Sequence, residues 1–305
     1  MPLNTIAYAE VLQTALDKKA VTTLTSGFMD ANAGQVIYNG GKYIKIPKIS
    51  LTGLMDYDRD DGYGKGSVTL EYAQKEMTMD RGTGFLLDAM DVNESNFIAS
   101  ASTAAGEFQR TQVVPEVDAY RYSRIASLTA ENETSYTPDA GTVFEALVDD
   151  IAVVRDLVGE NEEIVVSINS RVKSQLEKLK DFQRFVEVSE FSSGEIKTKV
   201  KAVNGAALMP VPSARMKDAY IFADGKTEGQ TRGGFKAAED ARQINWIVMP
   251  KRAPIAVCKQ DKMKIFSPDT YQKADAWFIG YRKYHDLWIK DSMLETIKSN
   301  VQPAA

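Results

Sequence analysis

The sequence predicts an α+β fold, and three observations support that prediction. Residues 42–51 and 67–72 have the pattern of two strands joined as a long hairpin. Residues 142–158 have the apolar spacing of an amphipathic helix, and residues 276–289 form a long strand rich in aromatic side chains. Helices concentrated in the middle of the chain and long strands toward both ends are typical of an α+β arrangement.

The hairpin at residues 42–76 is the stretch on which the functional prediction depends most. Val68, Leu70 and Tyr72 alternate with polar residues, which is the period of a strand with one apolar face. The intervening residues 53–66 are rich in glycine and aspartate and predict a projecting tip. Each arm would reach about 30 Å. A two-stranded hairpin is marginal alone in water, so either this chain or a neighbouring copy must cover it.

The segments on either side of the hairpin contain a predicted arm and a predicted long helix. Residues 1–35 are of low complexity apart from a possible short helix at 6–16, and they predict an arm that lies on other structure. Residues 80–84 predict a break in regular structure. A long, bent or interrupted helix is expected over residues 92–128, with capping-box spacing at Asp91 and Glu94 and a new start at Pro115.

The middle of the chain predicts a compact α/β unit. Thr142 and Glu145 have capping-box spacing, an apolar stripe follows, and Gly159 is expected to end the helix. Asp149 and Asp150 are expected on its solvated side. The remaining elements predicted here are a strand at 163–168, a helix at 170–180, and strands at 206–210 and 220–223.

The last third of the chain predicts strands. They are expected at 246–249, 255–258, 262–266 and 276–289, with a hairpin-like corner at 250–254. In the last strand, Ile279 and Tyr281 share one face, whereas Tyr284 and Trp288 share the other. Apolar residues on both faces indicate a strand that is covered on both sides.

Composition excludes several classes of protein. The chain has 305 residues, 44% of them hydrophobic, which is enough for a sizeable core. No apolar run approaches the length of a membrane span, and the first residues lack a secretory pattern. A single cysteine and a single histidine leave little material for disulfides or for zinc sites. The net charge of −5 argues against a basic nucleic-acid footprint.

No set of residues predicts catalysis, a cofactor site or a metal site. Asp56, Asp58 and Asp60 begin like a calcium loop, but the required glycine and glutamate are missing, so a solvated acidic tip is favoured. Glycine motifs at 62–66 and 225–227 lack the context that phosphate binding needs. His285 and Asp286 are adjacent on a strand, so their side chains point to opposite faces. The exposed tip tyrosines, Tyr57 and Tyr63, are better explained as docking groups.

The order of these elements resembles the tailed-phage major capsid proteins of the Hong Kong 97-type fold. Three stretches carry the resemblance: residues 57–70, 108–125 and 281–289. The resemblance implies an N-terminal arm at 1–36, an E-loop hairpin at 37–82, a spine helix and P-domain at 83–130, an α/β A-domain at 131–262, and closing strands at 263–305.

What the resemblance implies is a non-enzymatic coat protein. Its copies would form hexamers and pentamers of an icosahedral head around packaged double-stranded DNA, assembled in the host bacterial cytoplasm. A separate scaffolding protein and a portal protein are implied as partners, DNA contacts would be non-specific, and no membrane is involved. The E-loop would lie over the adjacent subunit, with the tip residues as contacts: Tyr57, Asp58, Arg59, Asp60, Tyr63 and Lys65. No acceptor matches Lys65, so no covalent cross-link is expected.

Two alternatives remain open from the residues alone. An encapsulin-like nanocompartment shell would share the fold and enclose a cargo enzyme. A soluble α/β enzyme with the hairpin as its lid is disfavoured, because no convergent catalytic set is visible.

Overall fold

The computed structural model describes most of the chain. It covers residues 24–38, 41–57, 59–60, 62–88, 106–179, 182, 186–193 and 196–304. The predicted helix at 6–16, the capping box at Asp91 and Glu94, and residues 92–105 of the helix expected at 92–128 lie outside these residues. None of the described helices is long and apolar enough to cross a membrane.

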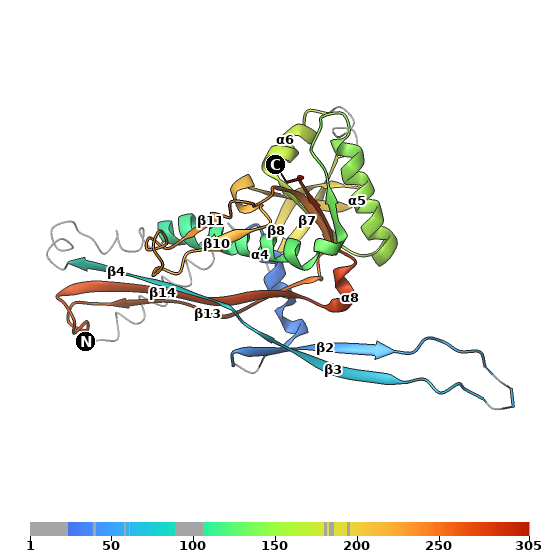
Figure 1. The fold of residues 1–305 in the computed structure, drawn as a ribbon, viewed down its shortest axis with the longest axis horizontal. Coiled ribbons are helices and arrows are strands. Elements are labelled where there is room, and N and C mark those ends of the chain that lie inside the picture. The colour runs from blue at the N-terminus through green and yellow to red at the C-terminus, as the bar shows by residue number, and fades with distance from the viewer. Residues whose placement is uncertain are drawn as a thin grey trace.

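A long three-stranded sheet forms one layer of the molecule (Figure 1). Its antiparallel strands, in spatial order, are β13 (Pro254–Phe266), β14 (Ala276–Ile289) and β4 (Met79–Asp88). Helix α4 (Val114–Leu128) runs along this sheet and continues the π-helical turn η2 (Gln109–Val113). Pro115 lies in the first turn of α4, but the helix does not start afresh there, because residues 106–113 are already helical. The interruption expected in this helix is the π-helical turn η2.

Both faces of β14 are covered, as predicted. Ile279 and Tyr281 pack with Met263 and Phe108 on one face. On the other face, Tyr284 and Trp288 pack with the base of the hairpin. The strand therefore joins these two apolar clusters, and its last residues, Leu287 and Ile289, belong to a third.

The prediction of a break at residues 80–84 is wrong, because these residues lie inside β4. Gly84 stands opposite Gly280 of β14, and the ring of Phe278 lies over both. A Cβ atom added at Gly84 would come within 2.7 Å of that ring, and one at Gly280 within 2.9 Å. These two glycines therefore allow close aromatic packing on the sheet, which a sequence pattern cannot distinguish from a turn.

A seven-stranded mixed sheet forms a second layer (Figure 1). Helices α5 (Val143–Val158) and α6 (Ser170–Leu176) cover one of its faces. A second apolar cluster joins the other face to α4 and β13. The strands in spatial order are β5 (Glu133–Ser135), β15 (Lys298–Val301), β12 (Ile244–Pro250), β6 (Ile164–Asn169), β9 (Ala206–Val211), β8 (Ile196–Val203) and β7 (Val186–Ser193).

The remaining short elements lie around these two layers. The segment at 250–254 is not a hairpin, because β12 and β13 belong to different sheets. The short elements are β1 (Ile37–Tyr38), β10 (Tyr220–Phe222), β11 (Phe235–Ala237), α8 (Asp291–Leu294), and the 3₁₀ helices η1 (Gly27–Gln35), η3 (Ala130–Asn132) and η4 (Ser213–Arg215).

Helix α5 is confirmed, but two details of it differ from the prediction. The Thr142 hydroxyl lies 2.9 Å from the Tyr136 hydroxyl and makes no cap hydrogen bond. Asp150 is buried, although it was expected on the solvated side. Its carboxylate accepts hydrogen bonds from Trp246 Nε1 at 2.7 Å and from Asn300 Nδ2 at 3.1 Å. Two buried donors on β12 and β15 therefore provide the polar partners that the helix pattern could not reveal.

The start of the described chain is fixed to α4 by a buried carboxylate. Asp118 accepts hydrogen bonds from the backbone N–H and the hydroxyl of Ser26, and it also forms an ion pair with Arg215. Arg121 is buried beside it and pairs with Asp30 at 2.6 Å. Residues 25–30 are thereby held against the middle of the long helix.

The predicted domain limits remain predictions. Strand β4 runs through the limit placed at residue 82, and β13 runs through the one placed at 262.

Candidate functional site

The hairpin projects from one end of the molecule, away from both layers (Figure 1). Its arms are β2 (Tyr43–Leu51) and β3 (Val68–Glu76), paired antiparallel from Tyr43 opposite Glu76 to Leu51 opposite Val68. The two strands expected from the sequence are therefore present, and β3 is longer than predicted. Apart from two pairs between β1 and the start of β2, the described sheet has no further strand along either arm.

The base of the hairpin is anchored in the protein. Ile44 and Ile46 are buried against Ile255 and Trp288. Further along the same face, Lys48 Nζ lies 3.0 Å from Asp291 Oδ2 of α8. An ion pair also joins the two sides of the hairpin at its base. Glu76 accepts a hydrogen bond from Lys42 and raises the pKa of that lysine.

Beyond Pro47 the apolar positions change to the opposite face. Residues directly opposite each other in an antiparallel pair share a face, so Ile49, Leu70 and their neighbours form one surface. We call this surface the hairpin patch, and its members are Pro47, Ile49, Leu51, Val68, Leu70 and Tyr72. The five apart from Pro47 are between 49% and 73% exposed. The opposite face carries Lys48, Ser50, Thr69 and Glu71 and is polar.

The tip brings together some of the predicted contact residues. Tyr57 and Tyr63 stack edge to face with ring centroids 5.1 Å apart, and they are 61% and 90% exposed. Arg59, Asp60 and Lys65 are also exposed. Asp58 lies outside the described residues. The role of all six residues as contacts between subunits stays a prediction.

The hairpin patch was not predicted as a functional surface, although the sequence contains a signal for it. Ile44 and Ile46 occupy even positions, whereas Ile49 and Leu51 occupy odd ones. A change of phase within one strand means that its two halves bury opposite faces. The inner half packs against this chain, and the outer half has no partner among the described residues.

Several solved structures share this arrangement of elements. The mature capsid of bacteriophage PhiM1 matches with a TM-score of 0.57 and 14% identity, over 87% of this chain and 83% of that one. The capsid of cyanophage P-SCSP1u matches with a TM-score of 0.55 and 13% identity, over 87% and 84%. A virus-like particle from Pyrococcus furiosus matches with a TM-score of 0.52 and 13% identity, over 97% and 99%. No protein-family model and no curated protein matches this sequence.

This chain has the Hong Kong 97-type capsid fold. We use the names of that fold as labels: the hairpin is called the E-loop, α4 the spine helix, and the three-stranded sheet with α4 the P-domain. The seven-stranded sheet with α5 and α6 is called the A-domain. The identities are all low, so the comparisons establish the fold and not the function of this chain.

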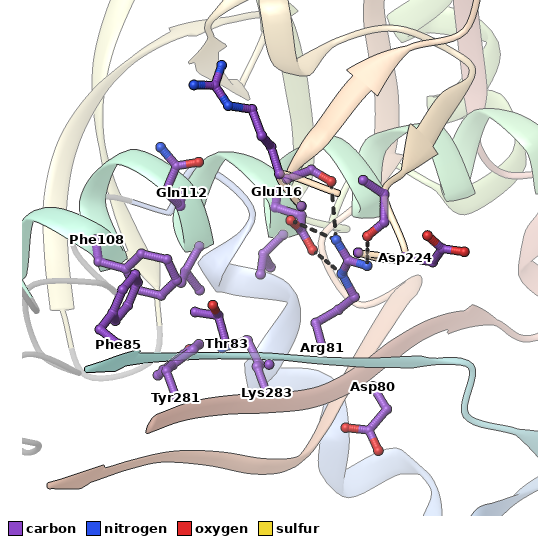
Figure 2. Close-up of a pocket in the computed structure, with 18 of the residues that line it drawn as sticks. Asp80, Arg81, Thr83, Phe85, Phe108, Gln112, Glu116, Asp224, Tyr281 and Lys283 are labelled. Carbon is purple, nitrogen blue, oxygen red and sulfur yellow. Dashed lines mark hydrogen bonds and ion pairs between the residues drawn. The ribbon is translucent and has the colours of Figure 1, made fainter. Parts of the chain in front are cut away.

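The P-domain also contains a cavity of about 800 Å³ between the spine helix and strands β4 and β14 (Figure 2). Arg81 projects into it and donates hydrogen bonds to Glu116 and to the carbonyl oxygens of Ala223 and Gly234. Lys283 is paired with Asp261. The side chains of Arg81 and Lys283 therefore connect elements of this chain to one another.

His285 and Asp286 do not act as a pair in this fold. Asp286 accepts hydrogen bonds from the Thr78 backbone at 2.8 Å and from the Tyr120 hydroxyl. His285 is buried edge-on against the Tyr120 ring, and its Nδ1 has no hydrogen-bond partner among the described residues. Burial, together with nearby Arg121, Lys283 and Arg81, holds the pKa of His285 well below 6.5. A neutral imidazole fits this site.

The acidic tip is not assembled as a metal site in the part of the chain that the structure describes. There, no group of three or more His, Cys, Asp or Glu residues is placed to hold a metal ion. Asp58 and Asp61 lie outside the described residues.

Proposed function

We propose that this chain is a major capsid protein of a tailed bacteriophage. Its copies self-assemble into hexamers and pentamers, which close into the icosahedral head that encloses the double-stranded DNA genome. The observation that carries the proposal is the hairpin patch, an apolar surface on a projecting E-loop with no partner among the described residues.

The energetics of the patch support a second copy as its partner. Burying a large apolar side chain stabilises by about 1.5 to 3 kcal/mol, so a strip of exposed ones favours association. Exposed apolar patches of this kind, bordered by polar residues, mark sites of protein contact. The polar face of the hairpin turns toward its own body through Lys48 and Asp291, which leaves the apolar face available to another subunit.

The proposal includes the location and the partners of the chain. The protein would reside in the virion after assembly in the host bacterial cytoplasm, with a scaffolding protein and a portal protein as partners. Its role would be structural and not enzymatic. The net charge of −5 suits a wall that holds DNA weakly and without sequence preference, because each phosphate contact would add salt-dependent affinity.

An encapsulin-like shell is the second candidate. The observation in its favour is the likeness to the Pyrococcus furiosus virus-like particle, which spans 97% of this chain and 99% of that one. Both candidates predict a closed shell, so only the contents of the shell distinguish them.

Electron microscopy of the chain, expressed together with its neighbouring genes, tests the proposal. We expect closed icosahedral particles built from pentamers and hexamers, with nucleic acid inside after packaging. Particles that hold a protein cargo and no DNA would favour the nanocompartment. A discrete monomer or dimer with catalytic turnover would refute both shell candidates.

A further inference from the structure

Helix α5 of the A-domain carries a surface that combines apolar and acidic side chains and has no partner in the described parts of the chain. Val153 and Leu157 are 49% and 53% exposed. Asp149 and Asp156 are exposed beside them, and no ion pair joins either of them to a described residue. Asp149, Val153, Asp156 and Leu157 together are called the α5 patch below.

The contacts of α5 show which way its apolar part faces. Val153 and Leu157 follow Asp150 by three and seven residues, so all three lie along one side of the helix. Asp150 bonds to Trp246 of β12 and Asn300 of β15. The apolar part of the patch therefore lies on the side of α5 nearest β15 and β5, which is one edge of the seven-stranded sheet.

The other side of α5 faces the rest of its own domain. Phe144 stacks edge-on against Phe182, with ring centroids 6.2 Å apart. Arg155 donates a hydrogen bond to the carbonyl oxygen of Asn204, in the turn between β8 and β9. The α5 patch thus points away from β8 and β7.

The opposite edge of the domain carries the complementary chemistry. Val188 of the edge strand β7 is 71% exposed and stands directly opposite Lys201 of β8, on the same face. Lys201 and Lys173 share a single carboxylate, that of Glu177, and Lys178 is exposed next to it. We call Lys173, Lys178, Val188 and Lys201 the basic edge. Among the described side chains, Glu177 is the one carboxylate paired with these lysines, so the described part of this surface has a net positive charge.

We propose that the α5 patch of one subunit binds the basic edge of the next subunit within a capsomer. Val153 and Leu157 would cover Val188, and Asp149 and Asp156 would pair with the lysines. This inference rests on the proposed function, because it assigns surfaces of the A-domain to the self-assembly proposed above.

Geometry and charge both favour a head-to-tail contact over a symmetric one. The two surfaces lie on opposite edges of one domain, and contacts between different surfaces generate rings when the rotation closes. Two α5 patches facing each other would bring carboxylates together, and such like-charge contacts suppress association. In a ring of subunits, the α5 patch of each subunit contacts the basic edge of one neighbour.

A charge-reversal series tests the pairing. Asp149→Lys with Asp156→Lys should reduce particle yield by about tenfold or more, as should Lys178→Glu with Lys201→Glu. All four substitutions in one chain should restore particles. The control is Glu228→Lys with Glu239→Lys, which makes the same change of charge at exposed residues elsewhere and should assemble normally. Circular dichroism checks that every variant is folded.

A cross-link provides a second measurement that does not depend on charge. In a Cys258→Ser background, chains with both Val153→Cys and Val188→Cys should be joined by a short bis-maleimide into a ladder ending at five or six chains. Chains with Val153→Cys alone should stay uncross-linked. Dimers from that single variant would show a symmetric contact and overturn the inference.

The failure of this inference differs from failure of the proposed function. If the wild-type chain forms particles and the charge-reversed pairs also do, the A-domain pairing is wrong and the capsid proposal stands. If the wild-type chain forms no particles under any condition of co-expression, the capsid proposal itself fails.

Discussion

Ile49 and Leu70 stand directly opposite each other across the two arms of the E-loop, and both side chains are more than half exposed. Only a few residues away on the same strand, Ile44 and Ile46 are buried in the P-domain on the other face. The hairpin therefore packs within its own chain at its base, and further out it carries an apolar surface that no described residue covers.

Replacing this pair by threonine should weaken assembly without unfolding the subunit. Ile49→Thr with Leu70→Thr keeps residues that favour strands and removes apolar area that a neighbour would bury, at about 1.5 to 3 kcal/mol for each side chain. Sedimentation velocity should show fewer particles and more free subunits. The matched control is Ser50→Ala with Thr69→Ala on the polar face, which should assemble normally. Equal loss in both variants would argue against the patch.

Asp118 should be essential for stability. It is fully buried, accepts hydrogen bonds from Thr25 and Ser26, and pairs with Arg215. Asp118→Ala would leave these donors and a cation without their acceptor, at a cost of about 3 to 5 kcal/mol in the free energy of unfolding. Urea denaturation of dissociated subunits measures this. Asp149→Ala, at an exposed position, should change it by less than about 0.5 kcal/mol.

Asp150 should make the subunit less stable as pH rises. Burial raises the pKa of Asp150 above its ordinary value of 3.8, despite hydrogen bonds from Trp246 and Asn300. Between 3.8 and the raised pKa, the folded chain binds this proton more tightly than the unfolded chain does. The contribution of this residue to the free energy of unfolding therefore falls as pH rises through that interval.

Asp150→Asn tests this dependence, because the amide oxygen keeps an acceptor for Trp246 Nε1 and does not titrate. The difference in unfolding free energy between the wild type and the variant should change with pH over that interval in the stated direction. A constant difference would show that Asp150 is ionised throughout or is not buried.

His285, in contrast, should make the subunit less stable as pH falls. Its pKa lies well below 6.5 in the folded state, so below pH 6.5 the unfolded chain binds the proton first. Stability from this residue is fully present above pH 6.5 and is lost progressively as pH falls toward the folded-state pKa. His285→Phe should flatten the fall in melting temperature between about pH 7 and about pH 5. The chain has one histidine, so an unchanged profile in the variant would refute this assignment.

The sequence predicted elements wherever one local pattern determined the structure. The two arms of the hairpin have alternating residues, α5 has a regular apolar stripe, and β14 carries apolar residues on both faces. The order of these elements was enough to predict the capsid fold. Each of these patterns lies within one element, and the tertiary contacts of that element agree with it.

The features that the sequence did not predict depend on contacts between distant residues. Gly84 lies in a strand that pairs with β14, almost two hundred positions later, and the ring of Phe278 packs over it. Asp150 is buried because Trp246 and Asn300 provide donors. The hairpin patch becomes recognisable only once the body of the protein is known to lie on the opposite face of Ile44 and Ile46.

The most direct test of the central claim, that the E-loop is covered by another copy, is deletion of residues 54–65. Circular dichroism and sedimentation velocity should together show a folded subunit that no longer assembles, because these residues belong to the exposed tip and contribute nothing to the described apolar clusters. An unfolded subunit would mean that the tip is part of the core, and normal particles would mean that no neighbour needs it. Either result would contradict the account.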